Sequence, residues 1–332
     1  MTSVPVKISR RKFVQGSLLA TAGGAIAINA GGNRVFAQGN TLSTPKAAPG
    51  SKGTLPKGKI GGLEMSRLML GGNLLTHFTH SRDLKYVYTL TAHYNTQQKI
   101  METMAVAESY GVDTLVIHTA AGAVDTIRKY RNEWGGKMKY IVCPTANIEP
   151  DLKAYSEQVK QLVDDGIDAI YLWGVRADAL VKEGKIDLVA KTVDCAKELG
   201  VPSGVGAHDL NVIKECEKNK IKTDFYVKTF HHFNYSTGPK PEEIKGPIRE
   251  IPGYWCSNPE ETIEFMKTVE KPWIAFKVMA AGAIPPKDAF RYALENGADH
   301  ILAGMFDFEI EEDAGIIKET IKSVKRTRPW RS

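Results

Sequence analysis

The sequence predicts a single α/β domain folded as a closed (β/α)8 TIM barrel. From Ile60 onward, short apolar runs alternate with longer segments of helical spacing, which is the pattern of repeated strand–helix units around a parallel sheet. Eight such units fit into about 270 residues, and this number favours a closed barrel over an open sheet. Several helical segments end on a glycine, the residue that favours a left-handed helix cap.

The apolar runs assign the eight strands in chain order. They are Arg67–Gly72, Thr114–His118, Lys139–Cys143, Ala169–Trp173, Ser203–Ala207, Phe225–Phe230, Trp273–Val278 and His300–Gly304. Between them, helices are expected at Gln97–Tyr110, Asp151–Asp164, Ile186–Leu199, Pro259–Val269 and Pro286–Glu295. Gly111, Gly166 and Gly200 follow the first three helices, and the last two begin with proline, which the first helical turn tolerates.

Residues 1–37 are expected to be a targeting segment that precedes the barrel. Arg10 and Arg11 stand before an uncharged run from Gly16 to Gly32, and Ala37 supplies a small residue for cleavage. This pattern resembles a twin-arginine export signal and predicts a periplasmic or secreted protein. The run is too weakly hydrophobic for a membrane span, so none is expected after signal removal. Residues 38–59 are predicted to be a flexible linker, and residues 60–332 the barrel.

Composition sets few limits on function. The chain has 332 residues, of which 42% are hydrophobic and 25% charged, and this is ample for one large core. The formal charge of +6 is modest and dispersed, so no nucleic-acid partner is expected, and the basic segment Lys318–Arg328 is assigned to the solvated end of the last helix. Cys143, Cys195 and Cys216 lie in apolar runs and are expected to be buried.

Functional groups of such a barrel belong at the carboxyl ends of the strands. In the sixth predicted strand, alternation is expected to point Lys228 and His232 into the barrel and to turn His231 away. In the seventh, the bulky residues are assigned to the helix-facing side, which leaves Lys277 to point inward. The same alternation of side chains predicts that His118, at the end of the second strand, and His208, after the fifth, also point into the barrel.

Two of the predicted loops are unusually long. Leu74–Asn95 follows the first strand and Phe233–Asn258 follows the sixth, and both are rich in aromatic residues. Both should overhang the same end of the barrel, where they would act as lids that exclude water from a small polar substrate. Insertions without catalytic function, or an oligomer contact, remain the alternative.

Three parts of the chain resemble aldo/keto reductases: Gly111–Gly122, Leu180–Ile186, and Ala280–Pro285 through Leu302–Met305. They are similar to that family's second-strand segment, to the stretch before its fifth strand and to its last two units. The resemblance extends over most of residues 61–320. It implies an eight-stranded barrel and, for the family as a whole, an NADP-dependent reduction of carbonyl groups.

The catalytic tetrad of that family, Asp, Tyr, Lys and His, is not retained. His118 stands at the aspartate position, only small residues near Ala123 at the tyrosine position, Pro144 or Thr145 at the lysine position, and Trp173 at the histidine position. The acid that protonates the carbonyl and the lysine that tunes it are both missing. The resemblance therefore implies the fold and leaves the reaction open.

A metal site is the first interpretation of the polar residues at the strand ends. His118, His208 and His232 are proposed as ligands of zinc, manganese or iron, with Asp209 or Asp307 as further candidates. Such a metal would polarise a carbonyl or a hydroxyl group of the substrate.

A metal-free lyase or isomerase is the second interpretation. Lys228 and Lys277 lie on adjacent strands, where two close ammonium groups would lower each other's pKa and make one a nucleophile, an arrangement similar to the paired lysines of deoxyribose-phosphate aldolases. Asp209 would orient the catalytic groups.

A sugar-binding barrel without catalysis is the third interpretation. An NADP-dependent reductase is the fourth, with Lys287 and Arg291 nearest to a cofactor phosphate.

Together these observations favour an exported enzyme that acts on a small oxygenated substrate, a sugar or keto-sugar. The expected chemistry is metal- or acid/base-assisted carbonyl activation of the lyase or isomerase type, and NADP is not the favoured cofactor. The sequence leaves the oligomeric state open.

Overall fold

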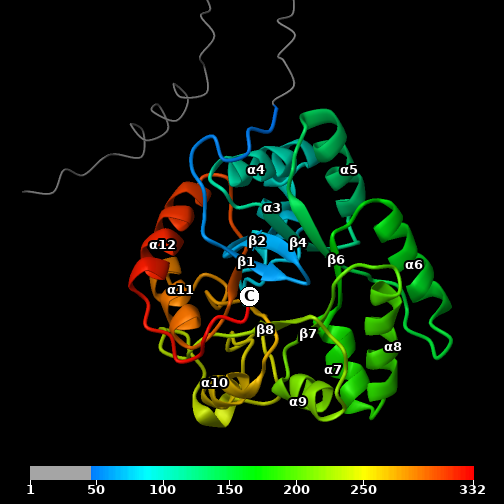
Figure 1. Ribbon diagram of the computed structural model, residues 1–332. Helices are drawn as coiled ribbons and strands as arrows, with labels where there is room; N and C mark the ends of the chain where they lie inside the picture. Colours follow the sequence, from blue (N-terminus) through cyan, green and yellow to red (C-terminus); the bar gives the residue numbers. More distant parts are fainter. Residues whose placement is uncertain (1–45) are drawn as a thin grey trace, which may run out of the picture. The chain divides into compact units, whose positions relative to one another are not determined.

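Residues 46–332, which the computed structural model describes, close eight parallel strands into a barrel in the order β10-β3-β4-β5-β6-β7-β8-β9. Helices surround the ring of strands (Figure 1). The strands are β3 (Leu68–Gly71), β4 (Thr114–His118), β5 (Lys139–Cys143), β6 (Ala169–Leu172), β7 (Ser203–Ala207), β8 (Phe225–Thr229), β9 (Trp273–Phe276) and β10 (His300–Ala303). The predicted (β/α)8 barrel is confirmed, and each predicted strand agrees to within two residues at either end. The predicted signal segment, residues 1–37, lies outside the described residues.

The helices follow the strands in the expected alternation. They are α2 (Gly72–Leu75), α3 (Tyr86–Tyr94), α4 (Gln97–Ser109), α5 (Ala123–Trp134), α6 (Lys153–Asp164), α7 (Gly174–Lys182), α8 (Ile186–Lys197), α9 (Leu210–Lys218), α10 (Pro259–Thr268), α11 (Pro286–Glu295) and α12 (Ile310–Ser323), with the short 3-10 helix η1 at Pro241–Glu243. Gly111, Gly166 and Gly200 all have positive φ angles, as predicted for glycines that close helices. Among residues 46–332, no helix has the length and apolar character needed to span a membrane.

A short hairpin, which the sequence did not predict, closes the amino-terminal end of the barrel. Its strands are β1 (Lys57–Ile60) and β2 (Leu63–Ser66), so the predicted linker gives way to ordered structure before residue 60. Ile60 and Met65 are fully buried against the side chains that fill the barrel. The hairpin crosses the centre of the ring in Figure 1 and forms the floor of the barrel.

Two layers of side chains divide the core. Ile274 and Phe276 of β9 lie inside the barrel, whereas Ala275 packs in the outer layer between strands and helices. The sequence-based assignment of the bulky β9 residues to the helix-facing side is therefore wrong. Large branched and aromatic side chains fill the interior of a barrel as well as its surroundings, so bulk alone does not set the phase of a strand.

The same error affects Lys228, which was predicted to point into the barrel. Phe225 and Val227 fill the interior, so Tyr226 and Lys228 face the outer layer. Lys228 is fully buried there, and its Nζ donates to the carbonyl of Thr229 at 2.8 Å and to Thr229 Oγ1 at 3.1 Å. The amine is satisfied behind the strand and is not presented at the end of the barrel.

Arg328, in the segment after α12, is buried, whereas Lys325, Thr327 and Trp330 in the same segment are exposed. Arg328 donates to Asp299 at 2.7 Å and to the backbone carbonyls of Gly297, Val269 and Lys271. Neither the Arg328 nor the Asp299 side chain is exposed. The cation and the carboxylate thus stabilise each other where water is excluded, and together they attach the chain end to the floor of the barrel.

Replacing Arg328 by methionine should lower the free energy of unfolding by about 3–5 kcal/mol, because Asp299 would remain as a buried charge without its main partner. Urea denaturation at neutral pH measures this loss. Arg331→Met is the matched control: its partner Glu270 is 73% exposed, so that change should cost about 1 kcal/mol or less. Equal losses in both variants would contradict the role of the buried pair.

Candidate active site at the barrel mouth

Lys277 stands at the carboxyl end of β9, one residue beyond the strand. Its φ angle is +57°, a left-handed conformation that lysine rarely adopts and that interrupts the alternation of side chains along the strand. The side chain therefore reaches the mouth of the barrel although Phe276 before it fills the interior. Lys277 Nζ lies 2.7 Å from His80 Nε2. The prediction that Lys277 faces the mouth agrees with this contact, but for a different reason than strand phase.

His80 links Lys277 to a carboxylate. Its Nδ1 lies 2.5 Å from Glu250 Oε1, and the indole N–H of Trp255 donates to the same oxygen at 3.3 Å. A carboxylate only accepts, so the imidazole proton lies on Nδ1 and Nε2 accepts from Lys277. Lys277 Nζ is also 5.7 Å from the centroid of the Trp255 ring and 5.7 Å from that of Phe276. A chain of hydrogen bonds therefore holds the amine over two aromatic rings.

Burial lowers the pKa of Lys277 to about 7, while the negative charges of Glu250 and Asp178 oppose that shift. Burial raises the pKa of Glu250, but hydrogen bonds from His80 and Trp255 outweigh it, and the net pKa lies below its usual value. The carboxylate is thus ionised at neutral pH. Lys277, in contrast, can give up or take a proton close to neutral pH, which is the property of an acid–base group or an amine nucleophile.

A second polar pair lies at the end of β7. His208 Nδ1 lies 2.7 Å from Asp178 Oδ2, a residue of α7, and His208 is only 4% exposed. The sequence assigned the orienting role to Asp209. In the structure the Asp209 carboxylate caps α9 by accepting from the backbone N–H of Asn211 at 2.9 Å. Asp178 holds His208 instead.

His118, at the end of β4, already has partners for both ring nitrogens. Its Nε2 lies 2.8 Å from Thr76 Oγ1, and its Nδ1 accepts from the backbone N–H of Ala120 at 3.1 Å. The ring of Phe78 packs edge-on against it at 4.6 Å between centroids. Burial lowers the pKa of His118. The residue anchors the first long loop and has no free nitrogen for a metal.

The predicted histidine metal site is not formed. His232 lies edge-on to Tyr292 at 4.9 Å between centroids, away from the other two histidines. Asp307, the other carboxylate considered, accepts from Tyr94 at 2.6 Å and pairs with Lys99. In the part of the chain that the structure describes, no three His, Cys, Asp or Glu side chains are arranged to hold a metal ion.

The two long loops meet above the mouth through the His80–Glu250 contact. The first of them also contacts the loop after β9, because Arg82 Nη2 donates to the carbonyl of Ala280. His231 fixes the other loop from below, because its Nε2 accepts from the backbone N–H of Trp255 at 2.9 Å. The loops therefore cover the amine of Lys277, as expected of lids.

Five buried polar atoms in these lids have no hydrogen-bond partner among residues 46–332, and two of them, Arg82 Nε and Glu250 Oε2, belong to residues beside Trp255. Both residues contact Trp255, since the Arg82 guanidinium lies 5.9 Å from its ring centroid and Glu250 accepts from its indole N–H. An unsatisfied buried donor and acceptor are costly in isolation. A ligand with one hydroxyl donor and one oxygen acceptor would satisfy them.

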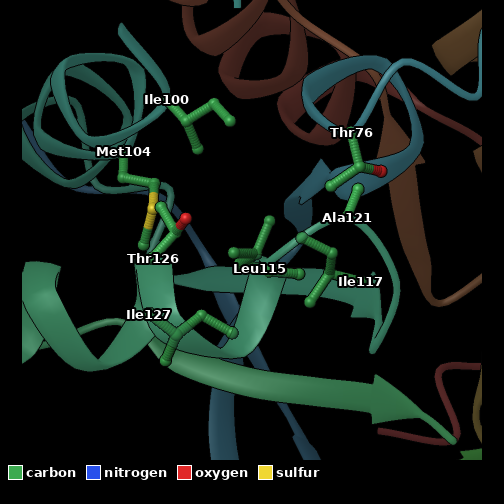
Figure 2. Close-up of a pocket in the computed structure, with 9 residues that line it drawn as sticks. Thr76, Ile100, Met104, Leu115, Ile117, Ala121, Thr126 and Ile127 are labelled. Carbon is green, nitrogen blue, oxygen red and sulfur yellow. The ribbon is translucent and has the colours of Figure 1, made fainter. Parts of the chain in front are cut away.

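A small cavity lies behind β4 and is distinct from this site (Figure 2). Its volume of about 10 Å³ is enough for roughly one water molecule. Apolar side chains predominate among its lining residues, which are Thr76, Ile100, Met104, Leu115, Ile117, Ala121, Ala123, Thr126 and Ile127. It is a packing gap between β4 and the helices α4 and α5.

The sequence did not predict that Asp178 and Glu250 belong to the site, and it did not predict the contact of His80 with Lys277. Asp178 lies in a helix without any motif, and Glu250 lies among other charged residues of a long loop. Their partners are 30 and 170 residues away in the chain. The only signal available was that a long loop containing three histidines follows the first strand.

No protein-family model and no curated protein matches the chain. Several solved structures are similar in fold. One is a Pseudomona aeruginosa protein assigned to the aldo-keto reductases, with 12% identity, a TM-score of 0.58, and coverage of 81% of this chain and 97% of that one. The holo form of aldo-keto reductase AKR11C1 from Bacillus halodurans has 13% identity, a TM-score of 0.53, and coverage of 83% and 98%. Gox0644 in its apo form has 10% identity, a TM-score of 0.52, and coverage of 82% and 95%.

Identities this low show the fold alone. The chain shares the (β/α)8 barrel of the aldo-keto reductases over nearly the whole length of those proteins.

The family resemblance implies a phosphate-bearing nicotinamide cofactor, but the expected phosphate position does not fit one. Barrels often bind phosphate after their seventh and eighth strands, at helix amino termini. Here α11 carries Asp288 in its first turn, and α12 carries Glu311, Glu312 and Asp313. The backbone N–H of Phe306 already donates to a carboxylate of the chain, that of Glu309 at 2.8 Å. Negative charge at these helix ends would repel a phosphate.

The cationic residues that the sequence put nearest to a cofactor phosphate do not change this. Lys287 is exposed, and Arg291 pairs with Glu295 on the outer surface of α11. Neither supplies a basic pocket at the mouth.

Replacing Glu250 by glutamine should lower the pKa of Lys277 below about 7, because the negative charge that favours the ammonium form is removed. Competitive acetylation across a pH series, followed by peptide mass mapping, gives the pH of half-maximal reactivity for this lysine. That midpoint should move to lower pH in Glu250→Gln and stay in place in Glu242→Gln, a change at an exposed position of the same loop. An unchanged or higher midpoint in Glu250→Gln would show that Glu250 does not act on the amine.

Proposed function

We propose that this protein is an enzyme that acts on carbonyl compounds and that Lys277 is the group that meets the substrate carbonyl. One observation carries this proposal: a lysine with a pKa of about 7 lies under two loops at the carboxyl end of a barrel strand. Barrel enzymes place their reacting groups at this end. Lys228, the buried lysine of the neighbouring strand, donates to the backbone and side chain of Thr229, whereas Lys277 contacts the imidazole of His80.

Amine chemistry is the reaction type that the side chains favour. At pH 7 about half of the Lys277 side chains would be uncharged, against roughly one in a thousand or fewer for an ordinary lysine. An uncharged amine adds to an aldehyde or ketone and forms an imine with loss of water. His80 accepts from the amine and can relay its proton toward solvent, while Glu250 stabilises the imidazolium. Lyases and isomerases use this chemistry.

Reduction is the reaction type that the comparisons favour, since two of the similar structures are named as aldo-keto reductases. A nicotinamide cofactor supplies the hydride in that chemistry. The residues of this chain offer Lys277 as the proton donor to the carbonyl oxygen. The acidic starts of α11 and α12 oppose a phosphate in the usual position, so a cofactor would have to be held by other residues.

The substrate we propose is a small hydroxylated carbonyl compound. Glu250 Oε2 and Arg82 Nε offer one acceptor and one donor next to Trp255, the ring that Lys277 also approaches. Sugars and keto-sugars belong to this class of compound. A simple aldehyde without hydroxyl groups would leave both polar atoms unsatisfied and should react less well.

Borohydride trapping tests the amine reaction. With hydroxyacetone and sodium borohydride at pH 7, the peptide that contains Lys277 should gain a reduced adduct far ahead of the exposed lysines. Lys277→Met should abolish this adduct, and Lys287→Met, at an exposed position of α11, should leave its yield unchanged. Labelling spread evenly over the surface lysines would argue against imine formation at this site.

NADPH titration tests the reductase. If the protein reduces carbonyls, hydroxyacetone should oxidise NADPH in its presence, and Lys277→Met should slow this by about 10²–10⁴-fold through loss of the proton donor. Lys287→Met should not weaken NADPH binding, because that side chain is exposed. NADPH binding is measured by the fluorescence of the cofactor. If this binding does not saturate, the reductase is ruled out and the amine reaction remains.

A further inference from the structure

We infer that His208 is a second catalytic residue of this site, the base that takes a proton from the carbon next to the substrate carbonyl, and that Asp178 is its positioning residue. This inference rests on the proposed role of Lys277 and narrows the substrate to aldehydes and ketones that carry a hydrogen on that carbon.

Asp178 fixes the tautomer of His208. Its carboxylate accepts from the backbone N–H groups of His208 and Asp209, each at 3.1 Å, and it lies 2.7 Å from His208 Nδ1. Because the carboxylate only accepts, the imidazole proton lies on Nδ1 and the lone pair lies on Nε2. Within residues 46–332, Nε2 makes no hydrogen bond. The base end of the ring is therefore left for a substrate.

The local backbone is shaped to bring the pair together. Gly174, the first residue of α7, lies directly against the imidazole, and a Cβ there would come within 3.2 Å of His208 Cε1 and 3.3 Å of Nδ1. Glycine permits this close approach, which places Asp178 one turn further along the helix at the ring. A pair that served only to attach α7 to β7 would not need a free Nε2.

His208 and Lys277 belong to one site. The His208 ring lies 5.7 Å from the centroid of Phe276, and Lys277 Nζ lies 5.7 Å from the same centroid. Burial lowers the pKa of His208, the Asp178 hydrogen bond opposes this, and the charge of Lys277 adds to the lowering. The net shift keeps the imidazole uncharged at neutral pH, which is the state of a base.

The reaction follows from these positions. The uncharged Lys277 amine forms a bond to the carbonyl carbon, and the oxygen leaves as water with the two amine hydrogens. The imine nitrogen then takes one proton from solvent, which gives a protonated imine. His208 Nε2 then takes the proton from the adjacent carbon. The electron pair of that C–H bond becomes the carbon–carbon double bond, and the C=N π pair moves to nitrogen, which gives a neutral enamine and an imidazolium that Asp178 stabilises. Return of a solvent proton to the carbon reverses the step.

Deuterium exchange separates the two proposals. Hydroxyacetone is incubated with the full chain in D2O, loss of the hydrogens next to its carbonyl is followed by proton NMR, and borohydride adducts at Lys277 are mapped in parallel. The wild type should show both adduct and exchange, and Lys277→Met neither. His208→Gln should keep the adduct but lose about 10²-fold or more of the exchange rate. Asp178→Asn should keep the adduct and lose exchange by a smaller factor.

His232→Gln is the matched control, because that histidine lies against Tyr292, and both readouts should be unchanged. Circular dichroism establishes folding of each variant, and Asp178→Asn provides the test if His208→Gln does not fold. Adduct formation with wild-type exchange rates in both folded variants would overturn the role of His208 while leaving that of Lys277 intact. A wild type that forms no adduct and catalyses no exchange would overturn both.

Discussion

Closure of the eight-stranded sheet is the constraint on which the rest of the structure depends. A closed parallel barrel has no free strand edge, and its interior is filled with side chains such as Met69, Val116 and Phe276. Charged groups cannot be placed among them without large cost. The polar chemistry is therefore confined to residues just beyond the strands, and Lys277 reaches this position only by a left-handed turn of its backbone.

The sequence predicted the strands of this barrel almost residue for residue, because parallel strands are short apolar runs between amphipathic helices. It did not predict which side of each strand faces inward. Strands such as Phe225–Thr229 are buried on both faces, so the pattern of apolar residues does not show which side chains face the interior. For this reason Lys228 was predicted inside the barrel, whereas it lies in the outer layer. The expected position of Lys277 at the mouth agrees with its contact to His80, and its catalytic role stays a prediction. His80, Glu250 and Asp178 could not be found from the sequence, since their roles arise from contacts between distant parts of the chain.

Buried polar groups lie at both ends of the barrel, and at each end some of them lack a partner within residues 46–332, Arg328 Nε at the floor included. At the floor, the Asp299 and Arg328 charges face each other, and Arg328 also donates to three backbone carbonyls. At the mouth, Glu250 Oε2 and Arg82 Nε are left without partners in the described part of the chain. Satisfied groups rigidify a structure, whereas unsatisfied ones are retained at a cost that ligand binding can recover. At the mouth, the two unpartnered atoms lie beside Trp255 in the two long loops.

The buried floor also constrains the order in which the protein can fold during synthesis. Asp299 and Arg67, the residue between the hairpin and β3, have partners that follow α12: Arg328 contacts Asp299, and the Arg67 guanidinium lies 3.9 Å from the centroid of the Trp330 ring. While this segment is still within the ribosome, the carboxylate of Asp299 lacks its main cation and the guanidinium of Arg67 lacks the Trp330 ring. The amino-terminal strands can therefore associate early, but the barrel reaches its final closed state only after residues 326–330 have emerged.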